Sequence, residues 1–344
     1  MTRARIFITQ PVAESAIERI AAIADVTVNP DASRILPKAA LIEAVRNADI
    51  LYCLLHDIVD QEVLAANPRL RAIASQTITP DSIDLQYATR FGIPVTVVPP
   101  IITDATADIT FALLLAVARR VVEGDALVRK GVFPGSQSAF VLGSDVTGKT
   151  IGLIGGKGRI GQAVARRARG FDMRVLYCGP HQLPAAEEKT IGFEYCTFDE
   201  LIAQSDFVSL HAALRPETRH LVGEREFKRM KPTAFFINTA RGPIVDEAAL
   251  ARALEAGEIA GAGLDVFERE PEVEPALLTM PNVVLTPHLG SAARDVRETM
   301  ANKVVDNIVA IVEGRTPPNC VNPETLGAPI PGPVSNRVLQ TRIK

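Results

Sequence analysis

Short apolar runs alternate with amphipathic stretches along nearly the whole chain, and this alternation constrains the fold more than any other feature. The runs are continuously apolar, which is typical of strands buried on both faces of a parallel sheet. The stretches between them, such as 13–24, 246–257 and 293–314, have helical periodicity. The expected strands are 4–9, 50–53, 70–75, 93–98, 150–155, 173–178, 207–210, 233–238, 259–265 and 282–286. The sequence therefore predicts the α/β class, with parallel sheets covered by helices.

The 344 residues are enough for two domains, and the strand positions predict two doubly wound parallel sheets. We expect the first domain over residues 1–100 plus about 296–325, because the last long helix should return to it. We expect the second domain over residues 101–295, after a Pro-Pro pair that serves as a hinge. The chain from residue 323 onward is rich in Pro and Gly, and residues 326–344 are expected to form a C-terminal tail.

The bulk composition excludes several classes of protein. A net charge of −3 and a pI of about 6.0 provide no basic field for nucleic acid or for an anionic membrane. The most apolar stretch, 109–118, is too short to span a bilayer, and residues 1–15 lack the pattern of a signal peptide. Four widely spaced cysteines form no C-x-x-C pair, which predicts reduced thiols in the cytoplasm and no metal site.

The strongest local motif is the glycine pattern G-x-G-x-x-G formed by Gly156, Gly158 and Gly161. It follows an apolar strand and opens a helix, as a dinucleotide-binding fingerprint requires. The first glycine permits a tight turn, the second lets the backbone approach a pyrophosphate, and the third lets helix and strand pack closely. The pyrophosphate would then lie on free N–H groups at the helix N-terminus. The plainer interpretation is a glycine-rich turn that binds nothing.

Two details of this segment differ from the usual fingerprint. An additional glycine, Gly155, precedes it, so that the turn is expected to carry one extra residue. The next strand ends at Gly179, where an acidic residue is expected to hold the adenosine ribose. Without that carboxylate a 2′-phosphate would not be repelled, and His181 is near. No arginine follows at once to bind the phosphate, so NAD and NADP both remain candidate cofactors.

Three polar segments each follow an apolar strand of the second domain and carry one residue suited to catalysis. The carboxyl ends of parallel strands face the ligand crevice, so these residues are expected at one edge of the sheet. They are Arg241 in segment 238–242, Glu270 in segment 265–271 and His288 in segment 286–291. The plainer interpretations are a structural arginine beside Asp246 for Arg241, a solvated carboxylate for Glu270 and a satisfied loop histidine for His288.

These segments, in this order, resemble the D-isomer-specific 2-hydroxyacid dehydrogenases, and the resemblance covers about residues 40–322. Its other motifs are ATADITFALLLAVARR at 105–120, SLHAALRPETRHL at 209–221 and NTARGPIVDEAALARALEAG at 238–257. The resemblance implies a flavodoxin-like substrate domain and a Rossmann nucleotide-binding domain. It also implies an NAD(P)-dependent oxidoreductase that interconverts a small 2-keto acid and its D-2-hydroxy acid, most closely of the glyoxylate/hydroxypyruvate reductase type.

The resemblance implies specific roles for the three residues. Arg241 would bind the substrate carboxylate and keto oxygen through its fork of N–H donors. His288 would be the general acid and base, because imidazole changes its charge near neutral pH. Glu270, rather than Glu268, would pair with that histidine and hold its ring tautomer. Asp265 would hold the nicotinamide carboxamide. The expected cofactor contacts are Gly156, Gly158, Arg159, Ile160, Gly161, Gly179, Thr106, Ala212, Thr239, Ala240, Asp265 and His288.

One loop departs from the family pattern. The family carries a G-x-G-x-D loop in its first domain, but the matching stretch 74–84 lacks both glycines. Its β-branched residues resist positive φ, so the loop is expected to take another shape. Thr77, Ile78 and Thr79 stand where flexible backbone is expected, so the hydroxyls of Thr77 and Thr79 or the amide of Gln76 would replace the missing N–H contacts. Leu54 and Leu55 match positions that line the substrate pocket in the family. The expected substrate-binding residues are Thr77, Ile78, Leu54 and Arg241.

Other functions remain open within the same fold. A phosphoglycerate or phosphite dehydrogenase-like enzyme shares much of the pattern, although no lysine lies between Lys38 and Lys130 to match the phosphite enzymes. A non-enzymatic NAD(H)-sensing protein of the corepressor type could keep all three residues. The apolar helix expected at 107–120 matches the segment through which the family pairs nucleotide domains, which predicts a homodimer.

Overall fold

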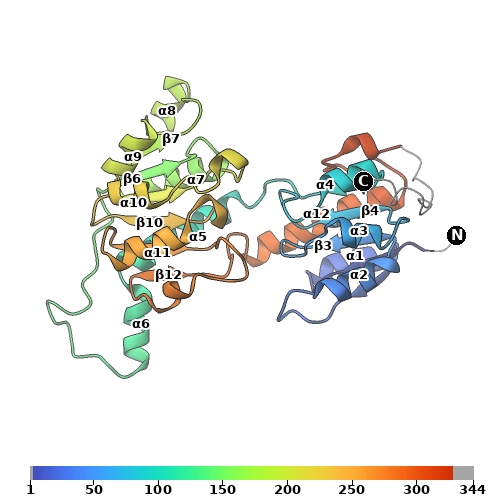
Figure 1. Ribbon diagram of the computed structural model, residues 1–344, viewed down its shortest axis with the longest axis horizontal. Helices are drawn as coiled ribbons and strands as arrows, with labels where there is room; N and C mark the ends of the chain where they lie inside the picture. Colours follow the sequence, from blue (N-terminus) through green and yellow to red (C-terminus); the bar gives the residue numbers. More distant parts are fainter. Residues whose placement is uncertain (1–2, 328–344) are drawn as a thin grey trace, which may run out of the picture. The chain divides into compact units, whose positions relative to one another are not determined.

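The computed structural model describes residues 3–327 and divides the chain into two compact units. The first unit combines Met1–Ile101 with Arg294–Lys344, and the second is Ile102–Ala293. Each contains one sheet in which every pair of neighbouring strands is parallel (Figure 1). The predicted fold class, two parallel α/β sheets, is therefore confirmed. The predicted tail, 326–344, lies almost entirely outside the described residues.

The sheet of the first unit has five strands in the order β2-β1-β3-β4-β5, which is the flavodoxin order. Residues Leu41, Val45 and Val63 of the helices pack against Leu51 and Ile73 of this sheet. The elements are β1 Arg5–Ile8, α1 Glu14–Ala21, β2 Asp25–Val28, α2 Lys38–Arg46, β3 Ile50–Cys53, α3 Gln61–Ala65, β4 Ala72–Ser75, α4 Leu85–Arg90, β5 Val95–Thr96 and α12 Arg294–Val312.

Helix α12 belongs to the first unit although the chain reaches it only after the second. It packs against α1 and β4, and two buried asparagines connect its end of the chain to β5. Asn307 donates to the carbonyl of Val97 over 3.1 Å. Asn322 accepts from the N–H of Val95 at 2.7 Å and donates to the carbonyl of Ile93 at 2.9 Å. These bonds satisfy polar groups that would otherwise be buried without a partner.

The sheet of the second unit has seven strands in the order β12-β11-β10-β9-β6-β7-β8, which extends the Rossmann order by one strand. Its elements are α5 Thr103–Ala118, α6 Val121–Arg129, β6 Thr150–Ile154, α7 Arg159–Arg169, β7 Arg174–Cys178, α8 Ala185–Ile191, β8 Phe193–Tyr195, α9 Phe198–Gln204, β9 Phe207–Leu210, α10 Glu224–Arg229, β10 Phe235–Asn238, α11 Glu247–Glu255, β11 Gly261–Leu264 and β12 Val283–Leu285.

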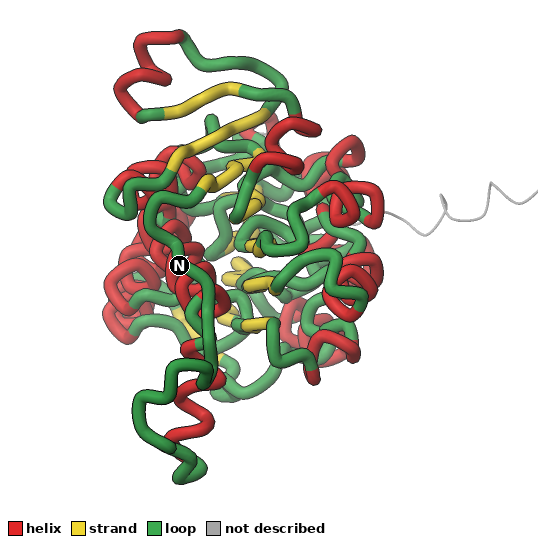
Figure 2. The backbone as a smooth tube through the Cα atoms, turned by 90° about the vertical axis from the view of Figure 1, so that its left-hand side faces the viewer, coloured by secondary structure: helices red, strands yellow, loops and turns green. Residues whose placement is uncertain are grey.

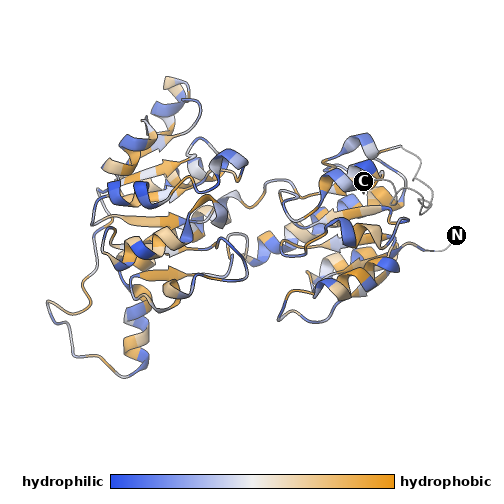
Figure 3. Cartoon of the chain, in the orientation of Figure 1, coloured by the Kyte–Doolittle hydropathy of each residue, from blue (hydrophilic) through white to orange (hydrophobic). Residues whose placement is uncertain are grey.

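Two apolar clusters cover this sheet, one on each face, and the central strand β10 shows the alternation. Phe235 and Ile237 belong to the cluster that includes α5 and α7, whereas Phe236 belongs to the cluster with α9, α10 and α11. Helices accordingly flank the strands on both sides (Figure 2), and many strand residues are coloured as hydrophobic (Figure 3). This burial on both faces is the reason that the strands read as continuous apolar runs.

Two strands, β2 and β8, are missing from the expected set. Both lie at a sheet edge. The β2 sequence DVTV alternates exposed and partly buried residues, and only Phe193 of the three residues in β8 is buried. An edge strand needs less apolar surface than a central one, so neither segment reads as a continuous run.

The apolar helix expected over 107–120 is interrupted. Helix α5 ends at Ala118, and Arg120 takes a left-handed backbone with φ of 51° before α6 begins. Helix α6 has no buried residue, and together with the loop that follows it extends away from the body of its unit (Figure 1). Among the described helices none has both the length and the apolar character needed to cross a membrane.

Candidate active site

The predicted catalytic residues all follow strands at the same edge of the second sheet. Strands β10, β11 and β12 are parallel neighbours, so that their carboxyl ends lie side by side. Arg241 follows β10, Glu270 lies in the loop after β11, and His288 lies in the turn after β12. Strand polarity alone therefore brings these three segments to one place.

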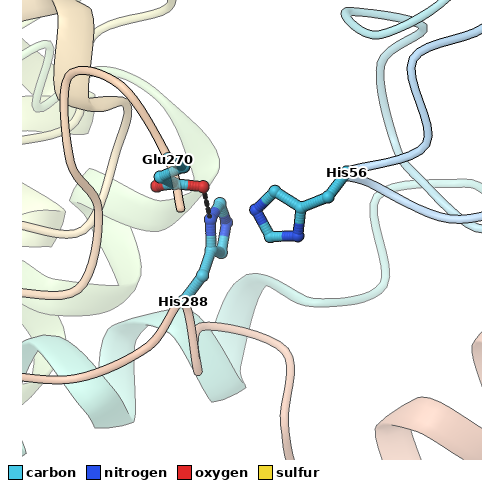
Figure 4. Close-up of side chains that lie close together, drawn as sticks. All are labelled: His56, Glu270 and His288. Carbon is cyan, nitrogen blue, oxygen red and sulfur yellow. Dashed lines mark hydrogen bonds and ion pairs between the residues drawn. The ribbon is translucent and has the colours of Figure 1, made fainter. Parts of the chain in front are cut away.

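His288 and Glu270 form a hydrogen-bonded pair (Figure 4). The Nδ1 atom of His288 lies 2.9 Å from Oε2 of Glu270, and a carboxylate can only accept, so Nδ1 carries the proton. The other carboxylate oxygen of Glu270 accepts from the N–H of Phe267 at 3.0 Å. The two side chains are 19% and 18% exposed. This hydrogen bond holds the orientation of the ring, and the exchange of a proton at Nε2 stays a prediction.

Asp265 holds the turn that carries His288. His288 has a left-handed backbone with φ of 54°, which is uncommon outside glycine. The fully buried Asp265 carboxylate accepts from the Thr286 hydroxyl at 2.6 Å and from the N–H groups of Leu289 at 2.6 Å and Gly290 at 2.8 Å. Burial raises the pKa of the Asp265 carboxyl, and these hydrogen bonds act against that rise. The contact of Asp265 with a nicotinamide carboxamide stays a prediction.

Arg241 stands on a turn that is built by Asn238. The Asn238 side chain accepts from the N–H of Ala240 at 3.0 Å and donates to the carbonyl of Arg241 at 3.2 Å. A Cβ atom on Gly242 would lie 1.8 Å from the carbonyl oxygen of Phe267. The arginine turn therefore packs directly on the backbone of the loop that carries Glu270.

The plainer interpretation of Arg241 paired it with Asp246. The carboxylate of Asp246 caps helix α11 by accepting from the N–H of Ala249 at 2.9 Å. This capping role in its own helix explains the presence of Asp246 without a pairing to Arg241.

The glycine turn lies between β6 and α7, and its extra residue has a physical explanation. Gly155 has φ of +80°, and a Cβ there would approach the N–H nitrogen of Ala212 to 2.8 Å. Gly161 lies so close to Gly156 that a Cβ would come within 2.5 Å of the Gly156 carbonyl oxygen. Gly158 caps helix α7 without a side chain, so the first N–H groups of this helix are available to an anion. The turn therefore fits a dinucleotide pyrophosphate.

The remaining predicted cofactor residues also lie in the second unit. Thr106 is buried, and its hydroxyl donates to the carbonyls of Ile102 at 3.0 Å and Gly290 at 3.1 Å. The hydroxyls of Thr239 and Thr110 lie 2.8 Å apart. Gly179 directly follows β7, and a Cβ there would meet nothing within 4 Å. This open space at the end of β7 is compatible with either a ribose hydroxyl or a phosphate.

His211 lies in the same unit but has a structural role. Its Nε2 atom lies 2.9 Å from the Ser209 hydroxyl. Burial lowers the pKa of His211 to about 4, so the ring is neutral at physiological pH. A neutral ring bound to Ser209 fits a structural residue rather than a second acid or base.

The atypical loop 76–84 belongs to the first unit and is held by its own side chains. Thr77 donates to the carbonyl of Thr79 at 2.7 Å, and its hydroxyl lies 2.7 Å from that of Ser75. The Tyr52 hydroxyl donates to the Gln76 side chain. Among the described residues 76–79 none has a positive φ. The loop therefore does not adopt the left-handed backbone conformation that glycines would allow. Ile78 is half-buried beside Thr77.

Leu54, the other residue expected to bind substrate, follows β3 in the first unit. Its N–H donates to the buried carboxylate of Asp57 at 2.7 Å, and the Thr9 hydroxyl donates to the same oxygen at 2.5 Å. Burial raises the pKa of the Asp57 carboxyl against these bonds. Leu54 is buried in this unit, and its role toward substrate stays a prediction.

Comparison with known proteins identifies relatives over nearly the whole chain. Residues 111–290 match the family model described as D-isomer specific 2-hydroxyacid dehydrogenase, NAD binding domain. A glyoxylate reductase from Thermococcus litoralis is 47% identical, over 94% of this chain and 98% of its own length. A D-lactate dehydrogenase from Aquifex aeolicus, solved with NAD and lactic acid, has a TM-score of 0.78 at 30% identity. It covers 92% of this chain and 99% of its own.

A third relative was solved with the other nicotinamide cofactor. An acyclic imino acid reductase in complex with NADPH and D-Arg has a TM-score of 0.78 at 30% identity. The match covers 92% of this chain and 99% of that reductase. Solved neighbours of this chain thus include complexes with NAD and with NADPH.

Proposed function

The chain belongs to the D-isomer-specific 2-hydroxyacid dehydrogenase family, and we propose that it reduces glyoxylate, or a 2-keto acid of similar size, with NADH or NADPH. Membership makes it an NAD(P)-dependent oxidoreductase that acts on the CH–OH group of a 2-hydroxy acid. The observation that carries the proposal is the His288–Glu270 pair at the strand edge that also holds Arg241. The relatives named glyoxylate reductase support the choice of substrate.

His288 acts as the acid in the reductive direction. Its Nε2 donates a proton to the keto oxygen and takes it back in the oxidative direction. The Glu270 carboxylate at Nδ1 stabilises the charged ring and fixes which nitrogen faces the ligand. The nicotinamide, when bound, supplies or accepts the hydride. Arg241 binds the substrate carboxylate through two N–H groups and orients the keto carbon.

The cofactor contacts follow from the same unit. The N–H groups of Arg159 and Ile160 at the start of α7 bind the pyrophosphate. Gly179 accepts either a ribose hydroxyl or a 2′-phosphate because no side chain fills the space beside it. We assign dinucleotide binding to the second unit and substrate contacts to Leu54, Thr77 and Ile78 of the first.

We further propose that the protein is a cytoplasmic homodimer. The arm formed by α6 and residues 130–145 exposes Val128 at 60%, Phe133 at 77% and Leu142 at 64%. Exposed apolar side chains gathered on one arm favour association with a second copy of the chain. Four free cysteines agree with a reducing compartment.

A substrate panel tests the proposed reaction. The loss of NADH or NADPH absorbance is followed with glyoxylate, hydroxypyruvate, pyruvate and phenylpyruvate, each with both cofactors. We expect turnover of glyoxylate with a kcat/KM above that of the bulkier phenylpyruvate. Cofactor binding without turnover of any of these acids would contradict the proposal and would favour an NAD(H)-sensing protein.

A further inference from the structure

Glu247 is absent from the predicted site, yet its carboxylate is bound to the loop that carries Glu270. It is the first residue of α11 and is only 7% exposed. One carboxylate oxygen accepts from the N–H of Glu268 at 2.6 Å, and the other accepts from the N–H of Glu274 at 2.7 Å. A carboxylate seldom occurs at this depth unless both its oxygens are hydrogen-bonded.

These two bonds attach both ends of the loop 268–274 to the Glu247 carboxylate, which we call the anchor. Inside it, the N–H of Glu272 donates to the carbonyl of Arg269 at 2.9 Å, which makes a tight turn. Glu270 lies in this turn with one oxygen on the Phe267 N–H and the other on Nδ1 of His288. The position of the Glu270 carboxylate therefore depends on the two ends that Glu247 holds.

The neighbouring carboxylates of Glu268 and Glu274 face cationic or histidine side chains, whereas both oxygens of Glu247 accept from backbone N–H groups. The Glu268 side chain binds His220 at 2.7 Å and lies 3.7 Å from Arg219. The Glu274 side chain lies 3.9 Å from Arg269. Three carboxylates thus gather near one another, and cations face two of them at the surface. Burying the third among like charges is costly, and the two short hydrogen bonds offset that cost.

We propose that Glu247 is a positioning residue for the reaction, because it holds the 268–274 loop so that Glu270 stays on Nδ1 of His288. Glu247 acts only through Glu270, and the proposal rests on the catalytic roles assigned above to Glu270 and His288. A carboxylate at the first turn of a helix also favours the helix dipole. The test therefore needs a readout that helix stability alone would not move.

The direct readout is the ring N–H proton of His288, which a hydrogen bond to a carboxylate moves far downfield in a proton NMR spectrum. The protein carries five histidines, and Glu270→Gln identifies the resonance by removing the carboxylate. We expect Glu247→Ala to shift this resonance upfield or broaden it. Glu247→Gln should give a smaller effect, because its single amide oxygen can hold only one of the two N–H groups. Glu255→Gln, at the exposed end of the same helix, is the matched control.

Kinetics provide the second readout. We expect Glu247→Ala to lower kcat/KM by about 10- to 100-fold through misplacement of the pair, with the cofactor Kd unchanged. Because Glu247 acts through Glu270, the double variant Glu247→Ala/Glu270→Gln should be no slower than Glu270→Gln alone. The pH profile of Glu247→Ala should change in the same direction as that of Glu270→Gln.

Two results would overturn the proposal. The first is a His288 resonance and a kcat/KM like those of the wild type in both Glu247 variants. The second is a kcat/KM in the double variant that falls by the product of the two single-variant factors. If Glu247→Ala does not fold, Glu247→Gln decides by the same two readouts. A failure of the proposed function looks different, because the wild type would then turn over no 2-keto acid. The dependence of the His288 resonance on Glu247 could still be observed in that case.

Discussion

At the scale of single residues, the account depends on a histidine held in an unusual backbone by an acid that is fully buried. His288 has positive φ, and Asp265 receives three hydrogen bonds from the residues around it. These bonds keep the turn in a conformation that the chain would not otherwise favour. Asp265 thus sets the backbone of the turn that carries the imidazole, and Glu270 sets the orientation of the ring through Nδ1.

Asp265→Asn is expected to impair catalysis and stability together. An amide must place an NH2 group against either the Gly290 N–H or the Leu289 N–H, so one hydrogen bond is lost. We expect a loss of about 1–3 kcal/mol in the free energy of unfolding and a fall of about 10- to 100-fold in kcat/KM. Asp60→Asn, which alters the cap of α3 in the other unit, is the control. Wild-type kinetics in Asp265→Asn would show that the turn does not need this carboxylate.

His211 is expected to make the second unit less stable in mild acid. The unfolded chain protonates this histidine near pH 6.5, whereas the folded chain does so only near pH 4. Between these values the unfolded state binds more protons, so the free energy of unfolding falls as pH falls through this window. We expect His211→Asn to remove of the order of 1–3 kcal/mol of that fall. Denaturant unfolding at pH 7 and pH 5 measures the fall in the free energy of unfolding for both proteins. The same fall in His211→Asn as in the wild type would contradict the prediction. His181→Asn, an exposed residue, is the control.

At the scale of elements, the sheets and the order of the catalytic segments were predictable, because both follow from apolar continuity and from strand polarity. The edge strands β2 and β8 were not, since edge positions do not require a continuous apolar run. The roles of Asp265 and Glu247 toward His288 and Glu270 also escaped prediction. They depend on hydrogen bonds between residues 21 to 27 positions apart, which local patterns do not reveal.

The glycine turn gives the prediction that belongs to this scale. Gly161→Ala would place a Cβ 2.5 Å from the Gly156 carbonyl oxygen, so helix α7 must move away from the turn. We expect the NADH Kd to rise at least about tenfold and stability to fall by about 1–3 kcal/mol. Fluorescence titration with NADH measures the Kd. Gly223→Ala is the control, because a Cβ there would make only ordinary van der Waals contacts. Unchanged NADH affinity would exclude this turn as the pyrophosphate site.

At the scale of the whole molecule, the arm of α6 and residues 130–145 is the surface through which we propose that two copies associate. Arg120 interrupts the helix with a left-handed backbone, so α6 leaves its unit and exposes its apolar side chains. We expect a dimer mass by light scattering for the wild type and a monomer mass for the double variant Val128→Asp/Phe133→Asp, because both changes put charge into a buried apolar contact. An unchanged mass in the double variant would place the interface elsewhere. Ile58→Asp, an exposed apolar residue of the first unit, is the control.

The central claim, that His288 exchanges the proton in a 2-keto acid reduction, is tested most directly by kcat/KM for glyoxylate in His288→Asn. Asparagine tolerates positive φ, so the turn should be kept while the acid is lost. We predict a fall of about 10²- to 10⁴-fold in kcat/KM, an NADH Kd close to that of the wild type, and no change in His181→Asn. A kcat/KM within a few-fold of the wild type in His288→Asn would contradict the assigned mechanism.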